Sequence, residues 1–305
     1  MPKNFWTKLD KPILALAPLA GFTDRAFREL CREFGAQVTY SEMVSATALF
    51  YNSQESLELM AFDRQKEKDF VVQLFGSEPE HFAVAARIIE KKIKPAGIDL
   101  NCGCPVKKVL NQGAGAALMK DLKRTREIIK VLSANTDRPI SLKIRAGNGR
   151  TDALKFLEAL SDLDIKAVMI HGRTLAGAFS GPIGFELIKQ ARNYFPGIIL
   201  ANGGLDSPAA IQEMLAKTGA DGVGLARGAL GNPWIFKGQE RPETAKIYKL
   251  MLRHARVALG FKGSSALIEL RKHLVYYVNG LPGASRLRAA LVRIETWDDL
   301  KQILR

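Results

Sequence analysis

The first 240 residues contain eight short apolar runs, separated by segments whose apolar residues recur at helical spacing. Most runs are four to eight residues long, end in Gly or a polar residue, and lack a strict alternation of apolar and polar positions. This near-continuous apolar character is typical of parallel strands that are covered on both faces. The eight predicted strands are Ile13–Leu19, Gln37–Val44, Phe70–Gly76, Gly97–Gly103, Ile140–Gly147, Ala167–Arg173, Gly197–Gly204 and Gly222–Gly228.

The segments between the runs are amphipathic, as helices that cover such a sheet should be. Phe82, Ala85 and Ile89 fall on one helical face, and Asp24 and Ser207 stand where helices are expected to begin. Eight strand–helix units in about 235 residues predict a fold of the α/β class, a (β/α)8 TIM barrel, which typically takes ~250 residues.

The alternative α/β architecture is an open, doubly wound sheet that binds a dinucleotide. Its Gly-x-Gly-x-x-Gly fingerprint should directly follow an early strand. The nearest match, at residues 113–118, lacks the third glycine and does not directly follow a predicted strand. The sequence therefore favours the closed barrel.

Beyond Phe236 the strand pattern stops, and the remaining residues predict four helices. Gly260 and the segment Gly280–Gly283 are expected to separate them, and Thr296 followed by Asp299 resembles a helix N-cap. A small helical bundle behind the barrel is the simplest architecture. We therefore expect two domains, a barrel at residues 1–240 and a helical domain at residues 241–305.

The net charge of +14 is unevenly distributed along the chain. Residues 241–305 hold 13 Lys and Arg against 5 Asp and Glu, a net charge of +8, whereas the first 240 residues carry +6. Such an excess suits a polyanion, of which nucleic acid is the commonest. Taken alone, a solvated basic helical surface explains the charge equally well.

The cysteine content indicates a reducing compartment, because three cysteines without repeated spacing do not form a disulfide framework. Cys102 and Cys104 form a lone Cys-x-Cys with no histidine cluster beside it, so no metal site is expected. No apolar run approaches the ~20 residues that span a bilayer. The run 13–22 is interrupted by Pro18 and is needed as a barrel strand, which argues against a signal peptide. We expect a cytoplasmic protein without a membrane segment.

Polar residues gather at the predicted strand ends, where the active site of a TIM barrel lies. Each has a structural alternative: Gln73 bonded to its interior neighbours, Lys143 paired with a carboxylate such as Asp99, His171 as a satisfied core histidine. Their occurrence at matching ends of successive strands favours a functional site. The strand-end candidates are Gln73, Asn101, Cys104, Lys143, Arg145, His171, Arg173 and Asn202.

Glycines follow the last two predicted strands, as Gly203-Gly204 and Ala226-Arg227-Gly228. Barrels hold phosphate groups at this place, using loop N–H groups and often a cation such as Arg227. Lys143 and Gln73 are suited to the edge of a flat ring, because a flavin needs amide partners and a nearby cation. Flavin mononucleotide fits both features, although spacing alone does not separate it from other phosphate-bearing ligands.

Cys104 lies in the segment Asn101-Cys102-Gly103-Cys104-Pro105, directly after a predicted buried strand. Flanking Gly and Pro fix the backbone there and expose the thiol. Free cysteines are usually buried and inert, which is the interpretation we adopt for Cys31 inside a predicted helix. For Cys104 the neighbouring strand-end candidates favour a chemical role.

Taken together, these motifs resemble those of bacterial dihydrouridine synthases over nearly the whole chain. The most specific are Asn-x-Gly-Cys-Pro ending at Pro105 and His-Gly-Arg-Thr beginning at His171, in this order. Further matches are Ala17–Asp24, Val72–Gly76, Lys143–Arg145, Asn202–Gly204, Arg227–Trp234, and, in the helical tail, Arg271–His273 and Gly280–Ala284.

The resemblance implies an FMN enzyme that reduces uridine in tRNA to 5,6-dihydrouridine, with NADPH as the reductant. It makes Cys104 the catalytic cysteine and places Asn101, Arg145 and Arg173 near the uracil. Gly204 and Gly184-Phe185 depart from the usual family pattern. The FMN contacts that it implies are Pro18, Leu19, Ala20, Gln73, Lys143, His171, Asn202, Gly203, Gly204, Ala226 and Arg227.

Reduction of the uracil double bond requires a hydride at C6, which a reduced flavin supplies from N5, and a proton at C5. A thiol has an ordinary pKa near ~8.5 and is mostly protonated at neutral pH, so Cys104 fits the general acid. Lys143 would stabilise charge on the reduced flavin, and His171 would orient it or its phosphate. The target uridine must be unstacked into the barrel mouth, and the basic tail would hold tRNA phosphates.

Two other functions remain open from the residues alone. One is a flavin-dependent barrel reductase of a free small molecule, and the other is a tRNA-binding protein without catalysis. The sequence offers no dedicated NADPH motif and no sign of an obligate protein partner.

Overall fold

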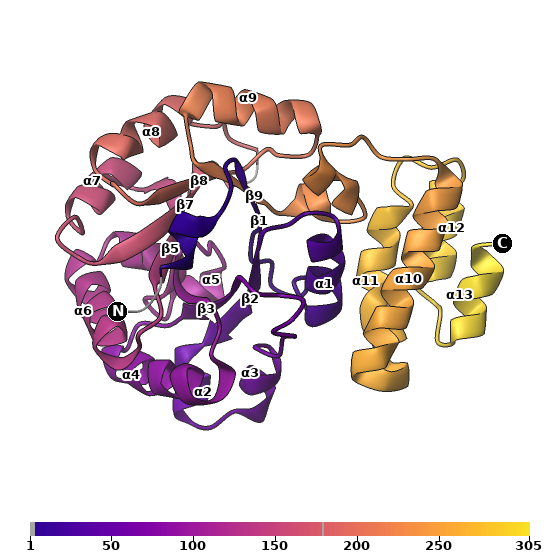
Figure 1. Cartoon of the computed structure of the whole chain (residues 1–305), viewed down its shortest axis with the longest axis horizontal. Helices are drawn as coiled ribbons and strands as arrows, with labels where there is room; N and C mark the ends of the chain where they lie inside the picture. The colour runs from indigo at the N-terminus through magenta and orange to yellow at the C-terminus, as the bar shows by residue number, and fades with distance from the viewer. Residues whose placement is uncertain (1–3, 179) are drawn as a thin grey trace.

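The computed structural model describes residues 4–178 and 180–305. Eight parallel strands close into a barrel, because β4 pairs with both β3 and β5 and the remaining neighbours follow in sequence order around to β1 and β9. The predicted TIM barrel is thus confirmed (Figure 1). Its strands are β1 Ile13–Leu16, β2 Val38–Ser45, β3 Phe70–Phe75, β4 Gly97–Cys102, β5 Ile140–Asn148, β7 Ile165–Thr174, β8 Ile198–Asn202 and β9 Gly222–Leu225, with a two-residue β6 Thr151–Asp152 antiparallel to β5.

Helices surround the barrel in the expected order (Figure 1). Asp24 caps the first of them by accepting a hydrogen bond from the Phe27 N–H at 2.9 Å, and Ser207 caps the last in the same way. Both caps were predicted from the sequence. The helices of this part are α1 Arg25–Glu33, α2 Ala46–Phe50, α3 Gln54–Glu58, α4 Pro79–Ile88, α5 Lys107–Leu110, α6 Leu122–Asn135, α7 Ala153–Glu158, α8 Phe185–Gln190 and α9 Pro208–Thr218.

Successive residues of each strand face opposite sides of the barrel wall. On β7, Ala167 and Met169 belong to a central apolar cluster, whereas Val168 and Ile170 belong to the larger cluster between strands and helices. The short helix η1 (Phe5–Lys8) adds Trp6 to the central cluster. Positions that continue the inward series beyond this cluster therefore reach the carboxyl end of the barrel.

Three predicted strands extend too far at their carboxyl ends, since β1, β8 and β9 stop at Leu16, Asn202 and Leu225. Pro18 has no N–H to join the ladder after β1. Gly203 has a φ of +109°, which is outside the extended region. The residues predicted as strand ends thus form the loops at the barrel mouth.

Four α-helices follow the barrel: α10 Thr244–Lys262, α11 Ala266–Tyr277, α12 Ala284–Leu291 and α13 Trp297–Ile303. Gly260 was expected to separate two helices, but it lies inside α10. That helix ends at Lys262, directly before Gly263, whose φ is +64°. An exposed glycine is tolerated within a long helix, whereas the backbone of Gly263, with this φ and a ψ of −153°, cannot continue it. Thr296 and Asp299 form the expected reciprocal capping box of α13.

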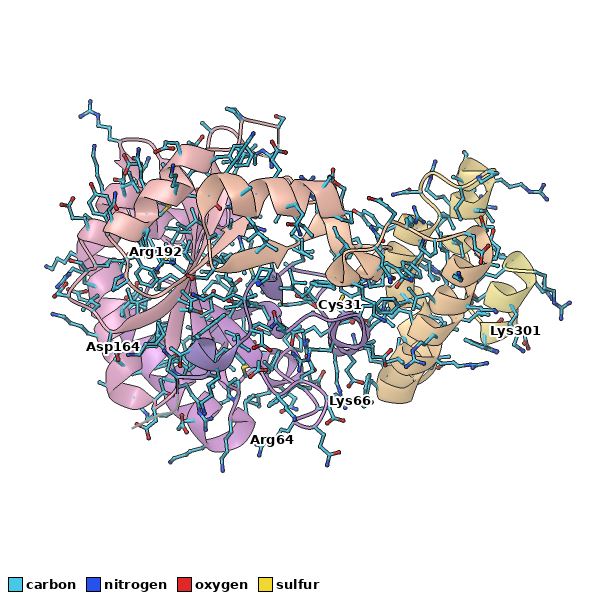
Figure 2. All side chains as sticks on the ribbon, turned by 45° about the horizontal axis from the view of Figure 1, so that its top comes forward. Cys31, Arg64, Lys66, Asp164, Arg192 and Lys301 are labelled. Atoms are coloured by element: carbon cyan, nitrogen blue, oxygen red, sulfur yellow. The ribbon has the colours of Figure 1, made fainter. Side chains whose placement is uncertain are left out.

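The four helices share their own apolar cluster, which also includes Ala26 and Leu30 of α1 and Trp234. Arg253 of α10 forms an ion pair with Glu33 of α1 at 2.6 Å. The helical part therefore packs directly on the first barrel helix, next to Cys31, which Figure 2 labels near this junction. Within the described residues, no helix is both long and apolar enough to cross a membrane.

Candidate active site at the barrel mouth

A cavity of about 590 Å³ lies at the carboxyl end of the barrel. It collects residues from the carboxyl-terminal parts of all eight barrel strands or from the loops that directly follow them. All of the residues that the sequence predicted for the site line it: Pro18, Leu19, Ala20, Gln73, Asn101, Cys104, Lys143, Arg145, His171, Arg173, Asn202, Gly203, Gly204, Ala226 and Arg227.

Strand register explains why these side chains converge. Asn101 on β4 lies opposite Lys143 on β5, Arg145 lies opposite His171 on β7, and His171 lies opposite Asn202 on β8. Each is an inward position, because its strand neighbours pack in the outer apolar cluster. On β7 and β8 the polar residues His171 and Asn202 lie two positions beyond Met169 and Leu200 of the central cluster, at the mouth of the barrel.

A chain of hydrogen bonds connects a buried carboxylate to the Cys104 loop. Asp99 accepts from Gln73 Nε2 at 2.7 Å, and Gln73 Oε1 accepts from Asn101 Nδ2 at 2.9 Å. The Asn101 amide oxygen then accepts from the backbone N–H groups of Gly103 and Cys104 at 3.1 and 2.9 Å. Gln73 and Asn101 therefore hold the backbone of Cys104 in place, and Asp99 anchors Gln73.

Asp99 also accepts from Ser141 Oγ at 2.6 Å. Burial raises the pKa of Asp99 to about 6, although the hydrogen bonds from Ser141 and Gln73 and the charge of Lys143 act against this. In the described part of the chain Asp99 forms no ion pair with Lys143, so that structural alternative for the lysine does not hold.

The pKa of Asp99 predicts a pH dependence of stability that can be measured by comparison with Asp99→Asn. Because the folded carboxyl binds its proton more tightly than the unfolded one, its contribution is fully present below about pH 4 and is lost as pH rises through about 6. The free energy of unfolding of the parent chain, relative to the variant, should fall by about 2.5 kcal/mol between pH 4 and 7. Urea unfolding at several pH values measures this.

Asp162→Asn is the control for that experiment, since the hydrogen bond from Arg126 lowers the pKa of Asp162 to about 2. The difference between parent and control should not fall in the same pH window. Parallel stability curves for the parent and Asp99→Asn would contradict the assignment.

Lys143 supplies an amine inside the cavity, with its Nζ 3.5 Å from Asn202 Oδ1. Burial and the neighbouring Arg145 lower the pKa of Lys143 to about 8, against the attraction of Asp99 and Cys104. Asn202 is held in turn, because its Nδ2 donates to the Gly224 carbonyl at 2.6 Å. The lysine is therefore mostly charged at neutral pH and has a fixed position.

His171 is neutral in this environment. Burial and the charges of Lys143, Arg145, Arg173 and Arg227 lower its pKa to about 3. A neutral imidazole offers one N–H and one lone pair. The positive charge of the mouth therefore resides on the lysine and the arginines, which makes the cavity suited to an anionic ligand.

Two of the three arginines that line the mouth, Arg145 and Arg173, donate to backbone carbonyls. Arg145 donates through Nε to the Gly103 carbonyl at 2.8 Å, which ties it to the Cys104 loop. Arg173 donates through Nε to the Gly181 carbonyl at 2.6 Å. Arg145 also donates through Nη1 to the carbonyls of Thr174 and Ala178, so both guanidinium groups are held by loops while their side chains line the cavity.

Cys104 is the one cysteine that lines the cavity, and it is half-buried. Cys102 and Cys31 are fully buried, and burial raises the pKa of both thiols. Cys102 belongs to the apolar cluster outside the barrel wall. The Gly-Cys-Pro turn after β4 thus separates a half-buried thiol that lines the cavity from a core thiol only two residues away.

Sequence reasoning missed several lining residues, of which Tyr276 is the most informative. Tyr276 lies on α11, so the helical part contributes directly to the barrel cavity. Its ring packs edge-on against Phe22, which also lines the cavity, with the centroids 5.6 Å apart. The other lining residues outside the predicted site set are Phe22, Met43, Gly103, Pro105, Leu205, Asp206, Gly228 and Leu230.

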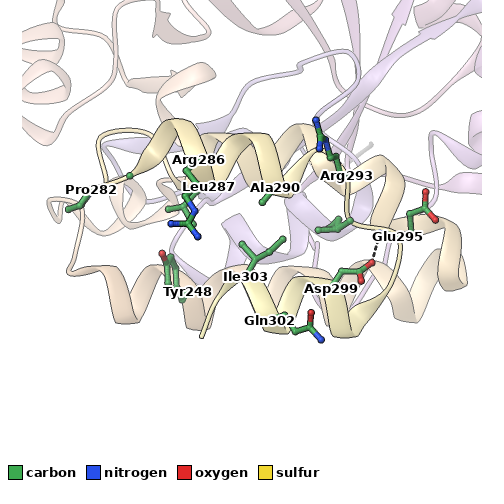
Figure 3. Close-up of a pocket in the computed structure, with 12 residues that line it drawn as sticks. Tyr248, Pro282, Arg286, Leu287, Ala290, Arg293, Glu295, Asp299, Gln302 and Ile303 are labelled. Carbon is green, nitrogen blue, oxygen red and sulfur yellow. Dashed lines mark hydrogen bonds between the residues drawn. The ribbon is translucent and has the colours of Figure 1, made fainter.

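A second, larger cavity of about 800 Å³ lies within the helical part (Figure 3). Arg286 and Arg293 line it together with Tyr248 and Asp299, whose Oδ2 accepts the Glu295 N–H at 2.9 Å. It has neither the thiol nor the convergent amide and amine groups of the barrel mouth. Its size therefore does not make it the better candidate for chemistry.

Comparison with known proteins agrees with this arrangement. Residues 15–305 match the family described as Dihydrouridine synthase (Dus). The chain is 35% identical to tRNA-dihydrouridine synthase B of Pseudomonas syringae pv. tomato (strain ATCC BAA-871 / DC3000), over 92% of this chain and 87% of that protein. It is 34% identical to tRNA-dihydrouridine synthase B of Pseudomonas aeruginosa PAO1, over 93% of this chain and 89% of that protein.

A solved structure, the old yellow enzyme homologue from Zymomonas mobilis, shares the fold with a TM-score of 0.54 and 15% identity, covering 76% of this chain and 90% of that one. The match of the family extends from β1 through the last helix, and it includes both the barrel cavity and the helices that contribute Tyr276. The chain belongs to the dihydrouridine synthase family.

Proposed function

We propose that this chain is a cytoplasmic, FMN-dependent tRNA-dihydrouridine synthase that uses NADPH to reduce the C5=C6 bond of uridines in the tRNA D-loop. The observation that carries the proposal is the single cavity that contains Cys104, Lys143, Gln73 and the glycine loop at 203–204. Residues 1–240 would form the catalytic domain and residues 241–305 the tRNA-binding domain.

The residues of the cavity fit FMN. Its volume of about 590 Å³ lies within the ordinary range for sites of small ligands. Gly203 brings its backbone so close to His171 that a Cβ would lie 2.6 Å from the imidazole Cδ2, so only glycine fits this loop. The loop N–H groups would bind the phosphate. Arg227 and the charge of Lys143 suit an anion and an electron-rich ring.

Gln73 would contact the ring through the one amide hydrogen that Asp99 does not use, since its oxygen already accepts from Asn101. Lys143 would hold positive charge at the pyrimidine edge, and neutral His171 would donate or accept one hydrogen bond. Pro18, Leu19 and Ala20 would supply backbone and apolar contacts across the ring. These roles follow the family resemblance, and the geometry permits each of them.

Bound FMN, once reduced by NADPH, would supply the hydride for C6 of the uracil. Cys104 would deliver the proton to C5 from the other face of the base, acting as the general acid. The Asp99–Gln73–Asn101 chain would keep the thiol in place, because it holds the Cys104 backbone N–H. Arg145 and Arg173 would bind the uracil or its phosphate.

The substrate must bring a single base into the barrel mouth. Phe22 and Tyr276 place aromatic rings there, and such rings can stack on an unstacked base. The excess of positive charge in residues 241–305 would bind the tRNA backbone without reading its sequence. The helical part would thus orient the tRNA while the barrel performs the reduction.

Gly203→Ala should weaken FMN binding by about tenfold or more, because the added Cβ displaces His171 and the backbone is at φ +109°. Gly219→Ala is the matched control, since Gly219 also has a positive φ of +62° but nothing lies within 4 Å of its Cβ position. Fluorescence titration with FMN measures the affinity of both. Equal affinities for the two folded variants would argue against a phosphate at this loop.

The colour of the purified protein tests the function as a whole. A yellow preparation should be bleached by NADPH and re-oxidised fastest by tRNA that lacks dihydrouridine, with dihydrouridine as the product. Equal re-oxidation by a free pyrimidine or enone would favour a small-molecule reductase instead. A colourless protein that binds tRNA but no FMN would favour a non-catalytic role.

A further inference from the structure

Three residues of metal-ligand type meet where the helical part packs on the barrel. Asp24 is the N-cap residue of α1, His254 lies on α10, and His273 lies on α11. Their potential ligand atoms all lie within 4.8 Å of one another, and no other group of His, Cys, Asp and Glu meets this test in the described part of the chain. Two separate segments of the chain thus supply one cluster.

The two histidines are buried without matching hydrogen bonds. His254 is 0% exposed and His273 is 1% exposed. His254 Nδ1 lies 3.1 Å from the Tyr277 hydroxyl, but among the described residues neither His254 Nε2 nor either nitrogen of His273 has a hydrogen-bond partner. Buried polar groups normally have a hydrogen-bond partner. Three buried imidazole nitrogens without one, beside a carboxylate, indicate that a partner able to accept ligand atoms, such as a metal ion, binds between them.

We propose that Asp24, His254 and His273 form a binding site for a divalent transition-metal ion, with Zn²⁺ the ion best suited to it. Two imidazole nitrogens and one carboxylate oxygen are an established donor set for zinc. The Tyr277 hydroxyl can accept the Nδ1–H of His254, which leaves the Nε2 lone pair for the metal. No metal site was expected from the sequence, because Cys102 and Cys104 have no histidine cluster beside them, and His254 and His273 lie 230 and 249 positions from Asp24.

The spacing of the cluster suits one ion after small side-chain rotations. Tetrahedral zinc at about 2.0–2.2 Å from each ligand needs ligand atoms roughly 3.3 Å apart. Asp24 retains one carboxylate oxygen for this purpose, because only Oδ1 accepts the Phe27 N–H. Chloride, water or a similar small ligand would complete the coordination.

The donor atoms of the cluster and the charges around it decide which cation can bind. Lys262 acts on Asp24, and Lys272 and Lys262 act on His273, so the cluster holds a single carboxylate beside two ammonium groups. Mg²⁺ and Ca²⁺ prefer several oxygen ligands and would find only one here. Imidazole nitrogens favour zinc and its neighbours instead, with an affinity below that of an all-thiolate site.

An ion bound here would connect α1 of the barrel to α10 and α11. None of the three ligands lines the barrel cavity, so the proposal does not depend on the reaction catalysed there. The His273 ring packs edge-on against Phe22 with centroids 5.3 Å apart, and Phe22 packs against Tyr276. Metal binding would therefore also fix two aromatic rings at the rim of the cavity.

The test uses the full-length chain after treatment with a chelator, with Zn²⁺ or Co²⁺ as the only added metal. Bound metal is counted after desalting, the Co²⁺ absorption spectrum reports imidazole ligation, and thermal unfolding reports stabilisation. Asp24→Asn keeps the helix cap, since Asn caps as well as Asp, but it removes the anionic ligand. His273→Phe keeps an aromatic ring beside Phe22 and Phe27, and His81→Gln removes a histidine outside the cluster.

The parent chain and His81→Gln should each bind one equivalent of Zn²⁺ and unfold at a higher temperature with it. Both cluster variants should lose more affinity than the roughly 10–100-fold that removal of an outer-shell partner causes. Absence of stoichiometric binding to the parent chain overturns the proposal, as does unchanged binding by Asp24→Asn. If His273→Phe does not fold, Asp24→Asn decides the question, because its cap is preserved.

Discussion

Cys104→Ala should lower dihydrouridine formation by about 10²–10⁴-fold, the range that a positioned proton donor contributes. FMN content and the rate of flavin reduction by NADPH should stay the same, because the side chain would touch the substrate base rather than the phosphate or the nicotinamide. Cys104 is the one cysteine in the cavity, and the described lining has no second thiol to replace it. Mass spectrometry of digested tRNA measures the product.

Cys102→Ala is the matched control, since it removes a thiol two residues away that is 0% exposed and packs outside the barrel wall. It should cost some stability through a small cavity and leave turnover intact at moderate temperature. Full activity of Cys104→Ala would exclude the thiol as the proton donor. Loss of FMN together with activity would show a structural role for the residue instead.

A triple variant should weaken tRNA binding by about 10–100-fold at moderate salt: Arg286→Gln, Arg288→Gln and Arg293→Gln. The slope of log affinity against log salt concentration should also become shallower, by the equivalent of about two to three phosphate contacts. These exposed arginines lie on or just after α12, and Arg286 and Arg293 line the cavity of the helical part (Figure 3). Binding of labelled tRNA at several salt concentrations measures both effects. FMN binding should not change.

Removing the same number of charges from the barrel exterior provides the control. Lys123→Gln, Lys130→Gln and Lys155→Gln alter exposed lysines on α6 and α7, on the side of the barrel away from the helical part (Figure 1). This triple variant should bind tRNA almost as well as the parent. An equal loss in both triple variants would mean that net charge alone, rather than the helical surface, drives binding.

Deletion of residues 241–305 is a poorer test than these substitutions. The helical part shares an apolar cluster with Ala26, Leu30 and Trp234, and Tyr276 lines the barrel cavity. Truncation would expose that cluster and alter the active site at the same time. Surface substitutions separate tRNA binding from the integrity of the barrel.

The barrel was predictable because its signals are local. Each buried parallel strand is a short apolar run, and the helix caps Asp24 and Ser207 depend on the next three residues. Candidates such as Lys143 and His171 could be predicted because they lie near strand ends and because successive side chains of a strand alternate between its two faces. The prediction that Gly260 separates two helices was wrong because it used the local signal alone. A glycine weakens a helix by only about 1 kcal/mol, and the tertiary packing of α10 outweighs this cost.

Contacts between distant segments were not predictable from these local signals. Tyr276 reaches the cavity from α11, and nothing in its neighbourhood distinguishes it from Tyr277, which is fully buried. The Asp99 carboxylate looked like a partner for Lys143, but its position in the register places Gln73 and Ser141 closer. Each of these depends on how the helical part docks or how neighbouring strands align.

The most direct test of the account is a crystal structure of the chain with FMN and a tRNA bound. We expect one D-loop uridine to lie in the barrel mouth, with FMN against one face of its uracil and Cys104 Sγ against the other. The reacting atoms should be about 3–3.5 Å apart. A sulfur on the same face as the flavin, or remote from the base while FMN occupies the cavity, would contradict the proposed mechanism.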